Sequence, residues 1–148
     1  IEKAVVNRME RFAAALINIP RETQQVLKQL RAMKKKLGLI SNADVTEVAA
    51  WERSPLAPCF DSVVFSCHAG CVKPEPEIYR IGMESLQVSP AQCVFVGDGG
   101  SNELQGARDV GITTVMITGV IRELWPERIE ERRPHADYVI ERLSELIA

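Results

Sequence analysis

The residues with the clearest chemical potential lie in a glycine-rich turn, VFVGDGGSNE, at residues 94–103. An apolar strand is expected to end at Gly97, and the glycines of the turn let the backbone bend tightly and expose its N–H groups. Asp98 and Glu103 could supply the hard carboxylate oxygens that Mg²⁺ prefers in proteins. The turn therefore predicts a site for a metal or a phosphate, although glycine-and-acid turns also join strands to helices where there is no chemistry.

Two other polar segments follow expected strands in the same way. Ser41 ends the apolar run at residues 37–41, and Asn42 follows it, so their hydroxyl, amide and backbone N–H groups could donate to phosphate oxygens. Taken alone, the pair is more simply interpreted as a helix cap. Lys73, in the loop VKPEPEIY at residues 72–79, could neutralise charge on a phosphoryl group or be an ordinary exposed lysine.

Alternating strands and helices must position these segments. Helices are expected over residues 2–18, 21–35, 43–52, 74–86, 101–110 and 141–147, and strands over 37–41, 62–66, 93–97, 113–118 and 137–140. This alternation is typical of an α/β protein with a doubly wound parallel sheet. Such sheets bind ligands beyond the carboxyl ends of their strands, so the three polar segments are expected to meet at one edge.

Length and charge limit the classes of protein to consider. The chain has 148 residues, which suits one domain, and a formal net charge of −2. Its only dense basic run, residues 34–36, ends an expected helix, which argues against a nucleic-acid-binding surface. No apolar run approaches the roughly 20 residues of a membrane span. We therefore expect a cytoplasmic protein that binds neither nucleic acid nor membrane.

The cysteines raise the question of disulfides or zinc. A 148-residue chain with an α/β pattern does not need a disulfide framework. Cys67, His68 and Cys71 are close in sequence but lack paired CxxC spacing, and Cys93 belongs to an expected strand. Bound zinc is the less favoured interpretation.

In their order and spacing, the three polar segments resemble the haloacid dehalogenase-like (HAD-like) hydrolase superfamily, in its phosphatase branch. ISN at residues 40–42 resembles the second motif of that family, Lys73 in KPEPEIY the third, and GDGGSNE at residues 97–103 the fourth. The resemblance implies that residues 20–148 form a HAD-like, Rossmann-like α/β core that lacks its first strand. Residues 1–19 would then be a helical remnant of a cap region.

The resemblance also implies an activity, that of a Mg²⁺-dependent phosphoric monoester hydrolase acting on a small phosphorylated metabolite. Ser41 and Asn42 would bind the phosphoryl oxygens, and Lys73 would act in catalysis by steadying both nucleophile and phosphate. Asp98 would hold the metal. Glu103 aligns with a second acidic metal ligand, at a position where Asp is commoner.

One part of the family pattern is absent from the sequence. The nucleophile of the family is an Asp in a DxD motif on a strand before the second motif, whereas the first Asp of this chain is Asp44 and no DxD occurs. Without that carboxylate, the aspartyl-phosphate of the family's covalent route cannot form. We therefore interpret the chain, which begins with Ile1, as a nucleophile-less fragment of a longer hydrolase that is inactive by itself.

The missing strand would lie between the strands that carry the second and fourth motifs. Its absence leaves two strand edges without a partner, and we expect this gap to be filled because unsatisfied buried backbone groups are costly. Three arrangements could fill it. Either the two strands pair directly, or a segment of a second copy enters between them, or an N-terminal piece of a parent protein stays bound there. The second arrangement would make the protein a homodimer.

Two alternative functions stay open. A non-catalytic phosphate-binding or interaction module would keep the pocket without turnover, and the absent DxD favours it. A haloacid-type dehalogenase belongs to the same superfamily, but its mechanism does not need Mg²⁺. The acids at Asp98 and Glu103 therefore count against a dehalogenase.

Overall fold

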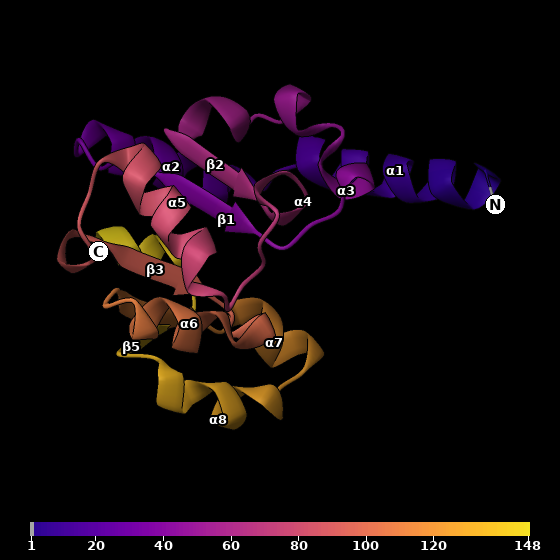
Figure 1. Ribbon diagram of the computed structural model, residues 1–148. Helices are drawn as coiled ribbons and strands as arrows, with labels where there is room; N and C mark the ends of the chain where they lie inside the picture. Colours follow the sequence, from indigo (N-terminus) through magenta and orange to yellow (C-terminus); the bar gives the residue numbers. More distant parts are fainter. Residues whose placement is uncertain (1) are drawn as a thin grey trace.

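A computed structural model describes residues 2–148 and shows parallel strands covered by helices (Figure 1). The strands are β1 (Gly38–Ser41), β2 (Ser62–Phe65), β3 (Val94–Gly97), β4 (Thr113–Ile117) and β5 (Tyr138–Ile140). Every strand pair among them is parallel, and helices lie between successive strands, so the predicted α/β class is confirmed.

The helices agree with the sequence where the apolar pattern is strong. They are α1 (Glu2–Ile17), α2 (Arg21–Ala32), α3 (Val45–Val48), α4 (Ser66–Ala69), α5 (Pro76–Leu86), α6 (Glu103–Asp109), α7 (Gly119–Leu124) and α8 (Arg128–Arg132). Helices α4, α7 and α8 were not expected, because short helices bury too few side chains to leave a periodic pattern. The helix expected over 43–52 is a single turn, α3, followed by a 3₁₀ turn, and the one expected over 141–147 is a 3₁₀ turn, Leu143–Ile147.

The expected single sheet is divided into two. Strand β1 pairs with β2, whereas β3, β4 and β5 form a separate sheet with β4 in the middle. The arrows of β1 and β3 point the same way in Figure 1, but within residues 2–148 no ladder joins them. Of the three ways in which we expected the gap to be filled, direct pairing of the two strands is therefore wrong, and the other two stay predictions. We call the space between them the β1–β3 gap.

The exposure of β1 and β3 gives the physical reason. Each of the two strands begins with an exposed residue and continues with half-buried ones. Strands β2 and β4 are mostly buried. Backbone groups on such partly exposed strands can bond to water, which lowers the penalty that we expected filling of the gap to relieve.

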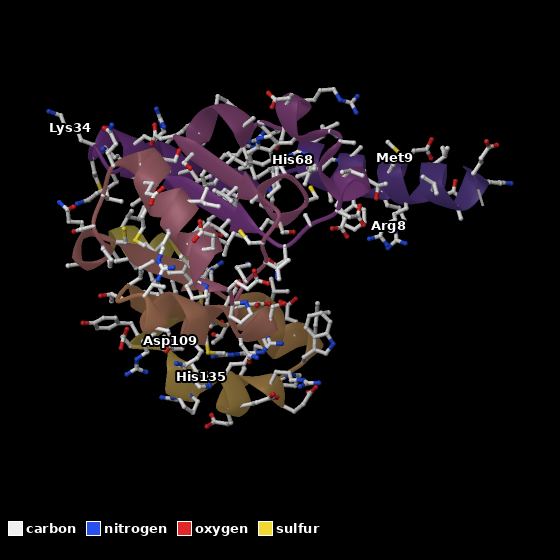
Figure 2. The ribbon with its side chains drawn as sticks, in the orientation of Figure 1. Arg8, Met9, Lys34, His68, Asp109 and His135 are labelled. Carbon is white, nitrogen blue, oxygen red and sulfur yellow. The ribbon has the colours of Figure 1, made fainter. Side chains whose placement is uncertain are left out.

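Helix α1 extends away from the rest of the molecule (Figure 1), and Figure 2 shows Arg8 and Met9 on it. Arg8 reaches α3, with its Nη2 atom 3.0 Å from Asp44 Oδ2 and 2.7 Å from Glu47 Oε1. None of the residues of α1 is buried, and its apolar residues Val5 and Met9 are exposed. That residues 1–19 are a cap remnant stays a prediction. Of the helices between residues 2 and 148, none combines the length and apolar character that a bilayer crossing requires.

The core beneath the site is centred on Tyr79 of α5, which is fully buried. Its hydroxyl donates to the backbone carbonyl of Glu103 over 2.8 Å, and its ring meets Phe95 edge-on at 5.5 Å between centroids. Burial, and secondarily the charge of Glu103, raises the pKa of Tyr79 well above its usual range. The hydroxyl therefore stays protonated and ties α5 to the start of α6.

We expect Tyr79→Phe to lower the free energy of unfolding by about 1–2 kcal/mol, because the buried carbonyl of Glu103 loses its side-chain donor. Chemical denaturation measures the change. The matched control is Tyr138→Phe on β5, where the side chain is exposed and a change within about 0.5 kcal/mol is expected. Equal effects of the two substitutions would contradict the role given to the Tyr79 hydroxyl.

Candidate functional site

The acidic turn directly follows β3 and adopts an unusual backbone path. Gly99, Ser101 and Asn102 all have positive φ angles, of 83°, 54° and 52°. Two hydrogen bonds fix the turn from within: Gly100 N donates to Asp98 Oδ1 over 2.7 Å, and Gly99 N donates to Glu103 Oε1 over 3.1 Å. The backbone N–H groups at residues 99 and 100 are therefore bonded to the turn's own carboxylates.

Lys73 reaches this turn from the loop that precedes α5. Its Nζ atom lies 2.5 Å from Glu103 Oε2, and the two side chains are only 12% and 8% exposed. The ammonium also lies 5.9 Å from the centroid of the Phe95 ring on β3. Because Glu103 Oε1 already accepts from Gly99, both oxygens of the Glu103 carboxylate are engaged.

Asn42 holds the backbone of the same lysine. Its Nδ2 donates to Lys73 O over 3.0 Å, and Lys73 N donates to Asn42 Oδ1 over 2.7 Å. The side-chain amide expected to bind phosphate is thus used to join the loop after β1 to the loop before α5. Ser41 precedes Asn42 in the sequence. It is half-buried at the end of β1, opposite Phe65 of β2.

The expected site residues therefore gather at the carboxyl ends of the strands. Lys73 contacts Asn42 on one side and Glu103 on the other, and Glu103 is linked to the turn that carries Asp98. The structure brings these four residues together, with Ser41 adjacent to Asn42. The chemical roles assigned to them stay predictions.

Sequence reasoning missed two residues that shape this edge. The Ser66 hydroxyl accepts from Ala43 N over 3.0 Å and donates to Ala43 O over 3.1 Å, which holds the loop after β1. Arg132 of α8 donates from Nη1 to Asp98 O over 3.1 Å and lies 3.6 Å from Asp98 Oδ1. Nothing in the sequence separates Arg132 from Arg128 or Arg133, since its role depends on a packing that is not local.

The donor groups of the turn only partly suit Mg²⁺, which takes carboxylate, water and phosphate oxygens in an octahedral arrangement. Asp98 fits as one ligand, because its side chain is 44% exposed and its Oδ2 atom has no hydrogen-bond partner among residues 2–148. Glu103 does not fit as placed, because Lys73 and Gly99 occupy its oxygens. In the described part of the chain, no three His, Cys, Asp or Glu side chains gather as a metal would require.

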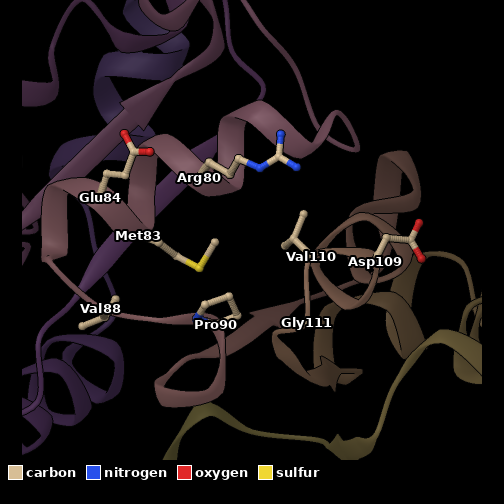
Figure 3. Close-up of a pocket in the computed structure, with 8 residues that line it drawn as sticks. All are labelled: Arg80, Met83, Glu84, Val88, Pro90, Asp109, Val110 and Gly111. Carbon is tan, nitrogen blue, oxygen red and sulfur yellow. The ribbon is translucent and has the colours of Figure 1, made fainter.

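A recess in the surface lies away from this edge. It has a volume of about 630 Å³ and is lined by the C-terminal parts of α5 and α6 and by the segments that lead into β3 and β4 (Figure 3). Pro90 and Gly111, which line it, precede their strands, whereas Asp98 follows its strand. The recess therefore opens at the amino ends of the strands, opposite the candidate site.

Comparisons with known proteins identify the family of this chain. The family model for haloacid dehalogenase-like hydrolase matches residues 2–111. The chain is 31% identical over 137 residues to a glyceraldehyde 3-phosphate phosphatase of Methanocaldococcus jannaschii, a match that covers 90% of this chain and 57% of the relative. It is 33% identical over 124 residues to bifunctional epoxide hydrolase 2 of Rattus norvegicus, which covers 76% of this chain and 21% of the rat protein.

Solved structures give the same family. A HAD phosphatase from Thermococcus onnurineus superposes with a TM-score of 0.73 at 31% identity, over 86% of this chain and 56% of the neighbour. A 2-haloacid dehalogenase from Pseudomonas syringae superposes with a TM-score of 0.65 at 26% identity, over 88% and 52% of the two chains. The chain thus spans about half of these neighbours. On the family match and the phosphatase relatives, the chain belongs to the haloacid dehalogenase-like hydrolases.

Proposed function

We propose that this edge of the sheet is the phosphate site of a phosphoric monoester hydrolase that acts on a small phosphorylated metabolite. The observation that carries the proposal is the position of Lys73 at the carboxyl ends of β1 and β3, where Asn42 holds its backbone and Glu103 holds its ammonium. A fixed cation at that place can stabilise the negative charge of a transferring phosphoryl group. The phosphatases among the relatives support the same reaction class.

Each residue has a proposed role in phosphate binding. Lys73 and the Ser41 hydroxyl would contact the phosphoryl oxygens, while Asn42 would act on phosphate through the loop that it holds. Asp98 would be the Mg²⁺ ligand of this chain, and Mg²⁺, when bound, supplies positive charge that polarises a phosphoryl oxygen. Direct coordination by Glu103 would require Lys73 or Gly99 to release one of its oxygens. We therefore assign Glu103 chiefly to holding Lys73.

The nucleophile of the proposed reaction would come from a strand in the β1–β3 gap. Both neighbouring strands are parallel to their partners and end at the candidate site, so a parallel strand between them would also end there. A DxD motif at the end of that strand would place a carboxylate beside Ser41 and Asp98. The proposal thus treats the chain as a nucleophile-less part of the hydrolase.

The test compares the chain alone with the chain in the presence of a synthetic strand peptide. The peptide carries five β-branched apolar residues followed by Asp-Leu-Asp. We expect the chain alone to hydrolyse p-nitrophenyl phosphate no faster than buffer with Mg²⁺, because it lacks the nucleophile, and we expect the peptide to restore turnover. A peptide with Asn in place of the first Asp should bind equally well, measured by thermal shift, without turnover.

Two results would contradict the proposal. Robust hydrolysis by the chain alone, abolished by Asp98→Ala, would show that the chain is not nucleophile-less in function. A stable complex with the Asp-Leu-Asp peptide that hydrolyses none of a panel of small phosphate esters would contradict the phosphatase activity itself.

A non-catalytic phosphate-binding module is the second candidate function. The pairing of both acids of the turn with basic side chains, Glu103 with Lys73 and Asp98 with Arg132, leaves few carboxylate oxygens for a metal and therefore favours it over a Mg²⁺-dependent enzyme. Binding of phosphate by the chain, without turnover in the peptide complex, would support the module. A cytoplasmic location and a homodimer that fills the β1–β3 gap stay predictions from the sequence.

A further inference from the structure

Arg132 is a cation at the candidate site that belongs to none of the three motifs. Its side chain is 20% exposed, against 62% for the neighbouring Arg133. The guanidinium donates to the carbonyl of Asp98 and lies 3.6 Å from the Asp98 carboxylate. It therefore reaches the one carboxylate of the turn that fits a metal ligand.

The stem of Arg132 packs on the turn itself. A Cβ atom added to Gly99 would lie 2.9 Å from both Cβ and Cδ of Arg132, so the methylene groups lie directly against the glycine. Gly99 also has a φ angle of 83°, which favours glycine. The turn and the arginine stem thus fit one another closely.

The position of Arg132 is fixed by the core and not by the surface. Helix α8 is anchored through Ile129, which packs against the buried cluster of Leu104, Met116 and Ile121. Two of these residues belong to α6 and β4, the elements next to the acidic turn. The core therefore fixes helix α8, and the contacts with Asp98 orient the guanidinium.

We propose that Arg132 is a positioning residue that supplies Asp98 with a built-in counter-ion, so that the site disfavours a free divalent cation and favours an oxyanion. A guanidinium so close to Asp98 repels a divalent cation at that carboxylate and attracts the negative charge of a phosphate. The inference rests on the proposed function, because it takes the turn to be the phosphate and metal site. It adds a residue, and a preference between ligands, that the three motifs do not specify.

The test measures both ligand classes on the same variants. Mn²⁺ binding is followed by electron paramagnetic resonance, and tungstate, a phosphate analogue, by isothermal titration calorimetry. For Arg132→Gln we expect Mn²⁺ affinity to rise about three- to tenfold and tungstate affinity to fall by a similar factor, because one positive charge is removed at short range in a partly exposed site. Thermal melting of each variant checks that it is folded.

Two further variants serve as controls. Arg133→Gln removes the same charge one residue along the chain, where the side chain is exposed and 3.8 Å from Glu130, and should change neither affinity by more than about twofold. Arg132→Lys keeps the charge but loses the planar guanidinium. Both affinities of this variant should therefore be closer to those of the unsubstituted chain than the affinities of Arg132→Gln are.

The outcomes separate this inference from the proposed function. Opposite changes in the two affinities support the role of Arg132, whereas a parallel fall in both, or no change in either, would overturn it. If the unsubstituted chain binds tungstate and the Gln variant binds it equally well, only the inference fails. If neither the unsubstituted chain nor its complex with the Asp-Leu-Asp strand peptide binds either probe up to millimolar concentrations, the proposed function and the inference fail together.

Discussion

Replacing Lys73 with methionine is expected to lower the free energy of unfolding by about 3–5 kcal/mol, which is the cost of removing one partner of a buried ion pair. The substitution keeps a long apolar stem but leaves Glu103, with a side chain only 8% exposed, without its cation. The remaining contact of the carboxylate, from Gly99 N, cannot offset the charge. Urea denaturation of the two proteins measures the difference.

Two variants make this result specific to the pair. Lys35→Met, in the exposed segment after α2, should change stability by no more than about 0.5 kcal/mol. The double variant Lys73→Met/Glu103→Gln should recover much of the loss, because a neutral amide oxygen can still accept from Gly99 while no charge is left buried. A loss below about 1 kcal/mol for Lys73→Met would show that the pair behaves like a solvated surface ion pair.

Hydrogen exchange is expected to reveal the β1–β3 gap as an open pair of strand edges. Each of these two strands has a ladder on one side only, β1 to β2 and β3 to β4. In the dilute monomer, amides of β1 and β3 that face the gap should exchange at least ~100-fold faster than the amides bonded within the ladders, because they are open to water. Nuclear magnetic resonance on the labelled chain resolves the two sets.

Filling the gap with a peptide gives a second test of the gap-facing amides, with the amides of β5 as the internal control. Addition of the strand peptide should slow exchange at the gap-facing amides of both strands and leave those of β5 unchanged, since β5 is remote from the gap in strand order. Slowing that depends on chain concentration, without peptide, would point to a second copy in the gap. Full protection of these amides in the dilute monomer would contradict the open gap.

The arrangement of elements was predictable where each element carries its own signal. Alternating apolar runs and amphipathic stretches mark β1 to β5 and the long helices, and parallel strands necessarily bring their carboxyl ends to one edge. This is why Asn42, Lys73 and Glu103 could be expected near one another from sequence alone. The short helices α7 and α8 escaped prediction because their six and five residues are too few to show a periodic apolar pattern.

The sequence by itself determined the family pattern, the identity of the chemical groups and the edge at which they gather, because these depend on residue types and on order along the chain. Only the tertiary structure decided which group meets which. Glu103 pairs with Lys73, Asn42 binds the Lys73 backbone, and Arg132 reaches Asp98 across 34 residues of chain. Such contacts depend on side-chain reach and on packing between elements that are distant in sequence. Local sequence patterns do not reveal either of these. The β1–β3 gap likewise depends on the solvent exposure of β1 and β3, a property of the assembled layers and not of either strand alone.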